Sequence, residues 1–258
     1  MKTSDISIQL YTARKFEPYD DVLSFFSNSG IKNIELFGIE NFNINEISNL
    51  LKKNNLKARS THVSFSALEN IELIIEKLKV LNIKHAIVPA PQEIPGKDFK
   101  SFFEKNEDEW NQFGIELSSY VKIFEENGIT LGYHNHSFEF IELPSGKMPI
   151  ECMLDHNENL KFEIDIGWAT AAKVDPIFWI KKYSKKIISC HLKDFFSKNH
   201  DLLNHNSQSS VGEGFIDWKK IFEELKKSNC ELFILEHDDP KDLKDYTLKS
   251  LNYLKDVN

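Results

Sequence analysis

The 258-residue sequence has only three cysteines and no apolar run long enough to cross a membrane. A transmembrane helix needs about 20 consecutive apolar residues, so no membrane partner is expected. Cys152, Cys190 and Cys230 lack the paired spacing of a metal site, and their odd number indicates free thiols in a reducing compartment. The start, MKTSDISIQLYTARKF, lacks the apolar core of a signal peptide. These features predict a cytoplasmic protein.

Positively charged residues are also fewer than negatively charged ones. Lysine and arginine number 32 against 40 aspartate and glutamate residues, which gives a formal net charge of −8. Phosphate backbones require a basic surface, so nucleic acid is not an expected partner. Glycine is absent after the first predicted strand, where Thr12-Ala13-Arg14 follows. A doubly wound nucleotide-binding sheet usually carries a glycine-rich phosphate loop there.

The sequence does contain a regular alternation of short apolar segments and amphipathic segments. The predicted strands are Ile6–Tyr11, Ile31–Phe37, Leu56–Phe65, His85–Val88, Ile129–His134, Phe162–Asp165, Ile187–Leu192 and Leu232–Glu236. The predicted helices are Tyr19–Ser29, Asn43–Asn54, Ala67–Leu81, Ser101–Asn127, Met148–Asp155, Pro176–Tyr183, Asp217–Ser228 and Pro240–Leu254. Alternating strands and helices specify a parallel sheet. Eight such units without a linker or repeat predict one (β/α)₈ TIM barrel over residues 1–258.

Polar residues follow almost every predicted strand. In a TIM barrel these strand ends form the active-site mouth. The ends supply, in chain order, Gln9 and Tyr11, Glu35, His62, then His134, Asn135, His136 and Glu139, then Glu163 and Asp165, then His191, Lys193 and Asp194, and last Glu236 and His237. So many converging acids would raise one another's pKa unless a cation compensated them. Mixed oxygen and nitrogen ligands suit Mn²⁺, Zn²⁺, Co²⁺ or Mg²⁺, so the sequence predicts one divalent metal ion.

Side-chain parity indicates which of these groups point inward. The outer face of a barrel strand packs on helices and is apolar. His191 and Lys193 share the face opposite Ile188, Cys190 and Leu192, and His134 and His136 share the face opposite Leu131 and Tyr133, so all four are expected inside the barrel. Both parities of the last strand are apolar, and Glu236 is placed at the mouth only by its position at the strand end.

Six motifs now carry a resemblance to a known family. They are ISIQLYTAR at 6–14, GYHNHSFEF at 132–140, FEIDIGWA at 162–169, CHLKDF at 190–195, VGEGFIDW at 211–218 and ILEHD at 234–238. The chain resembles the xylose isomerase-like TIM barrel group, which includes sugar and sugar phosphate isomerases and epimerases, inosose dehydratase and the more distant endonuclease IV. The motifs span nearly the whole chain in the expected order.

The resemblance implies one divalent metal held by Glu, Asp, His and Glu from successive strand ends. Asp165, His191 and Glu236 match the last three positions. The first position holds the run His134-Asn135-His136 instead of glutamate, so either His134 or Glu139 completes the set. We predict Glu139, because it restores the usual charge.

The expected activity is that of a metal-dependent isomerase or epimerase acting on a sugar or keto-sugar. A base removes a proton beside a metal-bound carbonyl to give an enediolate. His134 and His136 are the predicted bases, and Lys193 the predicted oxyanion partner. Glu163 is expected to be a supporting acid, paired with Lys193. The predicted substrate contacts are Gln9, Glu35, His62 and Trp168.

Other functions remain open from the sequence. A lyase or dehydratase acting on a keto-glycoside or cyclitol would use the same metal site, and the histidine-rich run 134–136 adds weight to it. An endonuclease IV-like nuclease is disfavoured by the net charge of −8. A non-catalytic sugar-binding barrel is the third class. The expected partner is a small carbohydrate, and a homo-oligomer is compatible with every class.

Overall fold

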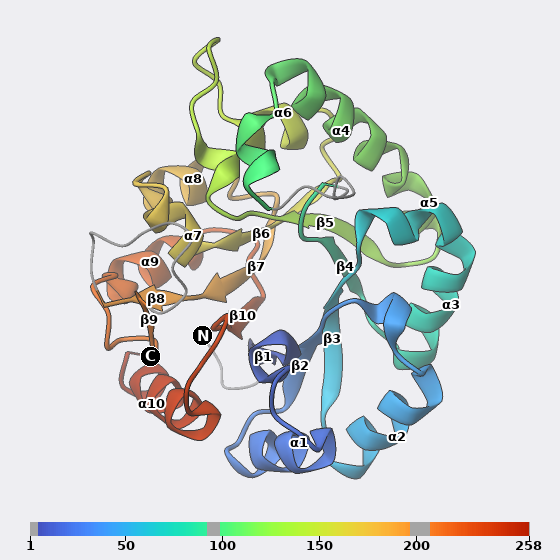
Figure 1. The fold of residues 1–258 in the computed structure, drawn as a ribbon, viewed down its shortest axis with the longest axis vertical. Helices are drawn as coiled ribbons and strands as arrows, with labels where there is room; N and C mark the ends of the chain where they lie inside the picture. The colour runs from blue at the N-terminus through green and yellow to red at the C-terminus, as the bar shows by residue number, and fades with distance from the viewer. Residues whose placement is uncertain (1–4, 92–98, 197–206, 258) are drawn as a thin grey trace.

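Eight parallel strands close into a barrel in the order β1-β10-β7-β6-β5-β4-β3-β2 (Figure 1). The computed structural model describes residues 5–91, 99–196 and 207–257. The barrel strands are β1 (Ile6–Gln9), β2 (Asn33–Leu36), β3 (Lys57–His62), β4 (His85–Val88), β5 (Thr130–His134), β6 (Lys161–Asp165), β7 (Ile187–Leu192) and β10 (Leu232–Leu235). The predicted TIM barrel is therefore confirmed.

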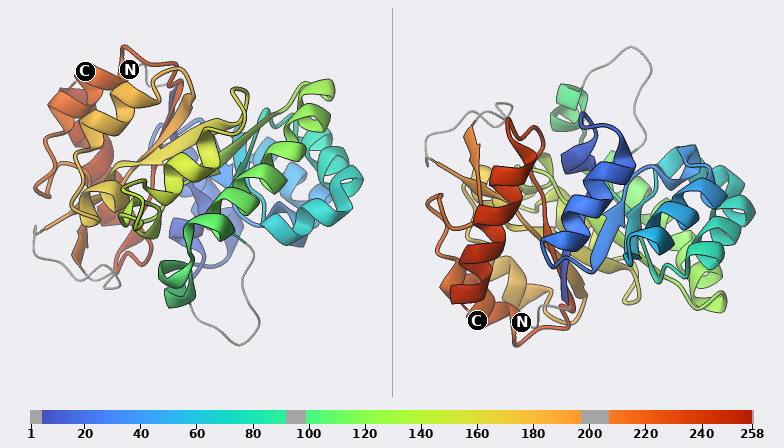
Figure 2. Two further views of the ribbon diagram at one scale, coloured as in Figure 1. Left: turned by 90° about the horizontal axis from the view of Figure 1, so that it is seen from above. Right: turned by 90° about the horizontal axis from the view of Figure 1, so that it is seen from below.

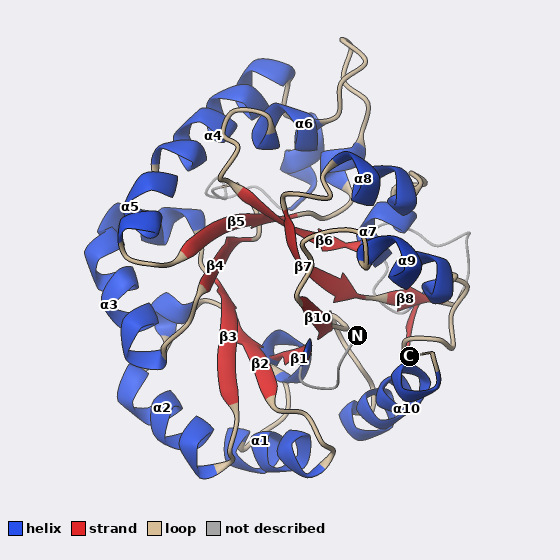
Figure 3. Cartoon of the chain, turned by 180° about the vertical axis from the view of Figure 1, so that it is seen from behind, coloured by secondary structure: helices blue, strands red, loops and turns tan. Residues whose placement is uncertain are grey.

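Helices surround the barrel on the outside (Figures 2 and 3). They are α1 (Tyr19–Asn28), α2 (Ile44–Lys53), α3 (Ile71–Leu81), α4 (Glu107–Ser119), α5 (Val121–Glu126), α6 (Pro149–Leu154), α7 (Ile166–Ala171), α8 (Pro176–Lys182), α9 (Trp218–Leu225) and α10 (Leu243–Asp256). Five 3₁₀ turns, η2 (Leu10–Ala13), η3 (Ile39–Asn41), η4 (Phe65–Asn70), η5 (Phe99–Glu104) and η6 (Phe138–Phe140), follow strands or precede helices. None of the described helices is long and apolar enough to span a bilayer.

Helix starts follow the capping residues that the sequence offers. Asn43 and Asp175 accept backbone N–H groups at the starts of α2 and α8. The long helix predicted over residues 101–127 is wrong. Asn106 and Glu109 form a capping box that starts α4, and Tyr120 separates α4 from α5. The capping box lies in the polar run 104–109 (EKNEDE), which interrupts the apolar pattern and marks the start of a new helix.

One helix and one small sheet that follow barrel strands were not predicted. Helix α7 begins directly after β6, because Asp165 caps it by accepting the Trp168 N–H. Strands β8 (Asp194–Phe195) and β9 (Gln208–Ser209) form a small antiparallel sheet beyond β7. Both elements lie at the mouth of the barrel and shape the site.

Strand register brings the polar residues together. His134 on β5 lies opposite Glu163 on β6, and Asp165 lies opposite His191 on β7. Glu35 on β2 reaches His191 although β2 and β7 are not neighbours in the barrel. Both side chains therefore point into the barrel interior, which confirms the predicted parity of His191.

Candidate active site

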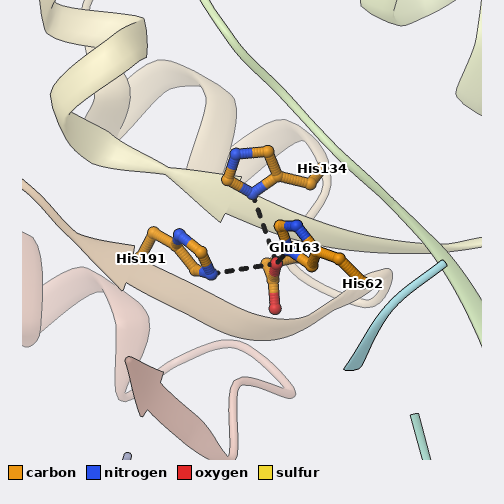
Figure 4. Close-up of side chains that lie close together, drawn as sticks. All are labelled: His62, His134, Glu163 and His191. Carbon is orange, nitrogen blue, oxygen red and sulfur yellow. Dashed lines mark hydrogen bonds and ion pairs between the residues drawn. The ribbon is translucent and has the colours of Figure 1, made fainter. Parts of the chain in front are cut away.

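Glu163 is the centre of a buried cluster of imidazoles (Figure 4). Its Oε1 lies 2.8 Å from His62 Nε2, 3.0 Å from His191 Nε2 and 3.2 Å from His134 Nδ1. Its Oε2 accepts the Ser189 hydroxyl at 2.7 Å. Burial raises the pKa of Glu163, but the charge of His191 and the imidazole hydrogen bonds outweigh it and bring that pKa well below the ordinary value. Glu163 is therefore an ionised carboxylate shared by three histidines.

A second group consists of Asp165, His191 and Glu236, whose ligand-type atoms lie within 4.8 Å of one another. His191 Nδ1 is 3.9 Å and His134 Nε2 is 4.0 Å from Asp165 Oδ2. In the described part of the chain, neither Asp165 Oδ2 nor His191 Nδ1 has a hydrogen-bond partner, and both atoms are buried. Buried polar atoms normally have partners, so this group has the features of a cation site.

Lys193 lies beside the same carboxylates. Its Nζ is 2.6 Å from Glu236 Oε2, 3.2 Å from Asp238 Oδ2 and 3.5 Å from Asp165 Oδ2. It also lies 4.4 Å from the centroid of the Trp168 ring. Burial lowers the pKa of Lys193, but Asp238, Glu236 and Asp165 outweigh burial and raise it, so the ammonium stays charged.

Positive charge is still insufficient around these acids. Burial, together with the charge of Asp238, raises the pKa of Glu236 to about 8 although Lys193 is close by. Burial likewise raises the pKa of Asp165. A bound divalent cation would favour the ionised form of both carboxylates, so the donor set fits the metal ion that the sequence predicts.

A cavity of about 510 Å³ opens onto both groups. Eight of the predicted site residues line it, namely Gln9, His62, His134, His136, Trp168, His191, Lys193 and Glu236. His136 stacks on Phe138 at 5.4 Å between ring centroids. Burial, and to a lesser degree the charge of Lys193, lowers the pKa of His136 to about 3, so its imidazole is neutral at neutral pH.

Glu35, a predicted substrate contact, does not line this cavity. It is fully buried beneath it, and its Oε1 lies 2.8 Å from His191 Nε2 and accepts from Gln9 Nε2 at 3.0 Å. The sequence placed Glu35 only at the end of a predicted strand. The depth of the residue in the barrel follows from strand register, which the sequence does not give.

Glu139, the predicted first metal ligand, belongs to neither group of ligand-type atoms. Its Oε1 accepts the Tyr133 hydroxyl at 2.6 Å, and its Oε2 accepts the His136 N–H at 2.7 Å. Burial raises its pKa to about 8. Both oxygens thus hold the turn after β5 in place, and the structure brings His134 rather than Glu139 to Asp165.

From the sequence, Glu163 is expected to be a supporting acid paired with Lys193, whereas the structure pairs it with three histidines. The alternation in FEIDIGW placed Glu163 on the same face as Asp165. The available signal was the number of inward histidines on neighbouring strands, each of which needs an acceptor when buried.

Sequence similarity identifies the family of this chain. A family model described as the xylose isomerase-like TIM barrel matches residues 24–257. The chain belongs to this family. A curated relative, inosose dehydratase of Clostridium perfringens (strain 13 / Type A), is 26% identical over 197 residues, which cover 70% of this chain and 65% of the relative. Inosose dehydratase of Bacillus thuringiensis (strain Al Hakam) is 24% identical over 58% of this chain and 55% of its own length. The chain thus matches less than two thirds of each relative.

Several solved structures share the fold of this chain at low sequence identity. A sugar phosphate isomerase/epimerase from Parabacteroides distasonis ATCC 8503 superposes with a TM-score of 0.78 at 18% identity, covering 99% of this chain and 94% of the other. The probable 3-DHS dehydratase AsbF from Bacillus anthracis gives 0.77 at 16% identity over 98% and 100%. The IOLI protein, whose structure includes a zinc atom, gives 0.75 at 14% identity over 98% and 97%.

Proposed function

We propose that this protein is a divalent-metal-dependent enzyme that removes a proton next to the carbonyl group of a sugar, keto-sugar or cyclitol. The observation that carries this proposal is the orientation of two imidazoles. Glu163 faces Nδ1 of His134 and Nε2 of His191, which leaves the opposite nitrogen of each ring directed at Asp165 Oδ2.

This orientation is the one that metal-ligating histidines adopt. Such residues almost always donate the second ring N–H to a carboxylate, which fixes the tautomer. Two atoms that share one ion at about 2.0–2.2 Å lie roughly 3–4 Å apart, and the distances of 3.9 and 4.0 Å to Asp165 Oδ2 agree with this. We assign His134, Asp165, His191 and Glu236 as the ligands, with Glu163 and Glu35 behind the histidines.

When bound, the ion would act as a Lewis acid that polarises a substrate carbonyl and so acidifies the neighbouring C–H group. His136 lines the cavity, and we assign it as the base that accepts the proton on a ring nitrogen. Lys193 Nζ donates a hydrogen bond to the developing oxyanion. Gln9, His62 and Trp168 surround the bound sugar and orient it.

The shared first step leads to two outcomes. Reprotonation at another carbon, or on the other face, gives an isomerase or epimerase. Loss of a hydroxyl group from the next carbon gives a dehydratase, and the similarity to curated inosose dehydratases supports this outcome. The substrate remains a small carbohydrate in both cases.

Metal analysis of the purified protein tests the site directly. Asp165→Ala and His191→Ala should lose the bound metal, whereas Asp256→Ala, on the exposed end of α10, should retain it. Unchanged metal content in both site variants would rule out the ligand set.

Incubation with keto-sugars and ketocyclitols in deuterated water tests the chemistry. Carbon-bound deuterium in recovered substrate or isomer supports proton abstraction, and an unsaturated product identifies the dehydratase outcome. Binding with neither deuterium uptake nor turnover in the metal-loaded protein would contradict the enzymatic proposal and favour a binding barrel.

A further inference from the structure

The charged groups that line the cavity are mostly acidic. Glu40, Glu236 and Asp238 contribute carboxylates, and Lys193 is the one ammonium or guanidinium among the described lining residues. The charge of Lys193 is already engaged by Glu236 and Asp238 at 2.6 and 3.2 Å. Even with Glu236 bound to a divalent cation, this cavity offers no uncommitted positive side chain among the described lining residues.

Glu40 extends this acidic character to the outer part of the cavity. It lies on η3, directly after the left-handed residue Gly38 (φ 58°) and Ile39. Lys77 Nζ donates to the backbone carbonyls of Ile39 and Glu40 at 3.1 and 2.6 Å, which fixes this turn. Glu40 Oε2 is buried without a hydrogen-bond partner among the described residues. As a carboxylate among the lining residues of the cavity, Glu40 suits a sugar hydroxyl and opposes an anion.

The usual phosphate position of a TIM barrel is occupied by the protein's own acid. Phosphate commonly binds in the loops after strands seven and eight, at backbone N–H groups. Here Asp194, after β7, accepts the N–H groups of Gly212 and Ile216 at 3.0 and 3.3 Å and the Trp218 Nε1–H at 2.8 Å. The donors that could cradle a phosphate are therefore already satisfied by a carboxylate.

The same holds after β10, the eighth barrel strand. Asp238 accepts hydrogen bonds from Lys193 Nζ and from the side-chain amide of Gln208, and its own N–H donates to Gln208 Oε1 at 2.8 Å. A phosphate at this position would face the Asp238 carboxylate. The groups that donate hydrogen bonds there already bind Asp238.

The cavity also has an apolar wall away from the metal group. Phe37, Pro89, Ala90 and Phe102 line it. Cavities of about 300–1,000 Å³ bury most of a drug-sized ligand, and the volume here is about 510 Å³. One sugar ring at the metal group leaves space along this wall for a second, uncharged group.

From these contacts we infer that the active site takes an uncharged keto-sugar or glycoside and rejects phosphorylated sugars, with Glu40 as a specificity-determining residue. This inference rests on the proposed function for the position of the reacting ring. It separates this chain from any relative that acts on sugar phosphates.

Calorimetric titration of the metal-loaded protein tests the inference. The probes are matched pairs, D-fructose against D-fructose 6-phosphate and phenyl β-D-glucopyranoside against its 6-phosphate. We expect each uncharged member to bind at least about tenfold more tightly than its phosphate, since a dianion near one unscreened carboxylate loses about that much. If neither uncharged probe binds more tightly than its phosphate partner, whether or not any binding is seen, the inference is overturned.

Two variants assign the effect to Glu40. Glu40→Gln should reduce the preference several-fold, and Glu40→Lys should reverse it for at least one pair. Glu76→Lys, on the exposed face of α3, makes the same charge change away from the cavity and should leave the preference unaltered. An unchanged preference in Glu40→Lys with a native melting curve would exclude the assigned role. Metal content and deuterium exchange, measured on the same samples, report failure of the proposed function separately.

Discussion

Replacing Glu163 by glutamine tests the cluster most directly, because the change keeps the shape of the side chain and removes its charge. Hydrogen bonds to charged groups are worth about 1.5–3 kcal/mol and neutral ones about 0.5–1.5 kcal/mol. The loss is therefore about 1 kcal/mol for each proposed ligand histidine that Glu163 Oε1 contacts, His134 at 3.2 Å and His191 at 3.0 Å. A total of about 2 kcal/mol corresponds to a roughly 30-fold weaker metal affinity, within the about 10–100-fold range known for such supporting residues.

Competition with a fluorescent chelator measures this affinity for Zn²⁺ and Mn²⁺. Glu139→Gln is the matched control, because Glu139 is an equally buried glutamate that binds Tyr133 and the His136 N–H but lies in neither ligand group. We expect the control to change affinity by less than about threefold. An unchanged affinity in Glu163→Gln with intact folding, or an equal loss in Glu139→Gln, would refute the assignment of Glu163 and His134.

Three further predictions concern stability. Gly214→Ala would place a Cβ 2.0 Å from Asp194 Oδ1, a clash that should cost about 1–3 kcal/mol and lower Tm by several degrees in calorimetry. Trp218→Phe removes the Nε1–H that Asp194 accepts at 2.8 Å and should cost about 1–3 kcal/mol in urea unfolding, without loss of metal. The pKa of Glu139 is raised from 4.5 to about 8 by burial, so the folded protein holds a proton that the unfolded chain releases in this interval. Stability should fall as pH rises between these values, and Glu139→Gln should flatten that slope; an equally steep slope in the variant would contradict the shift.

Much of the fold follows from sequence pattern. The order and approximate limits of the eight barrel strands could be predicted because most of them are short runs rich in apolar residues between turn or capping residues, although β3 (KARSTH) is not. The helix predicted over residues 101–127 failed because the polar run 104–109 (EKNEDE) interrupts its apolar positions, and the capping box at Asn106 starts a new helix there. Periodicity reports which face is buried, but a local hydrogen bond decides where one helix ends and the next begins.

The sequence predicted which residues belong to the candidate site, but not how those residues pair. Parity placed His134, His136 and His191 inside the barrel and strand ends placed the acids at its mouth, yet neither could decide which acid meets which imidazole. Glu139 was predicted as a metal ligand because it restores the usual charge of the ligand set. Its oxygens instead accept hydrogen bonds from the Tyr133 hydroxyl and the His136 N–H. The pairing of Glu163 with His62, from β3, depends on barrel closure, and no separation along the sequence encodes that contact.

Asp165 has two roles, and the sequence alone does not show that one residue can combine them. An acid at a strand end can cap the following helix or bind a metal, and here Oδ1 caps α7 through the Trp168 N–H while Oδ2 faces His134 and His191. Asparagine is as good an N-cap as aspartate, so Asp165→Asn should retain the cap and lose the metal. Asp165→Ala should lose both, at an additional cost of about 1 kcal/mol, or about 2–4 °C in Tm. Calorimetry and metal analysis of the two chelator-treated variants separate these roles, and metal retained by Asp165→Asn would show that Oδ2 is not a ligand.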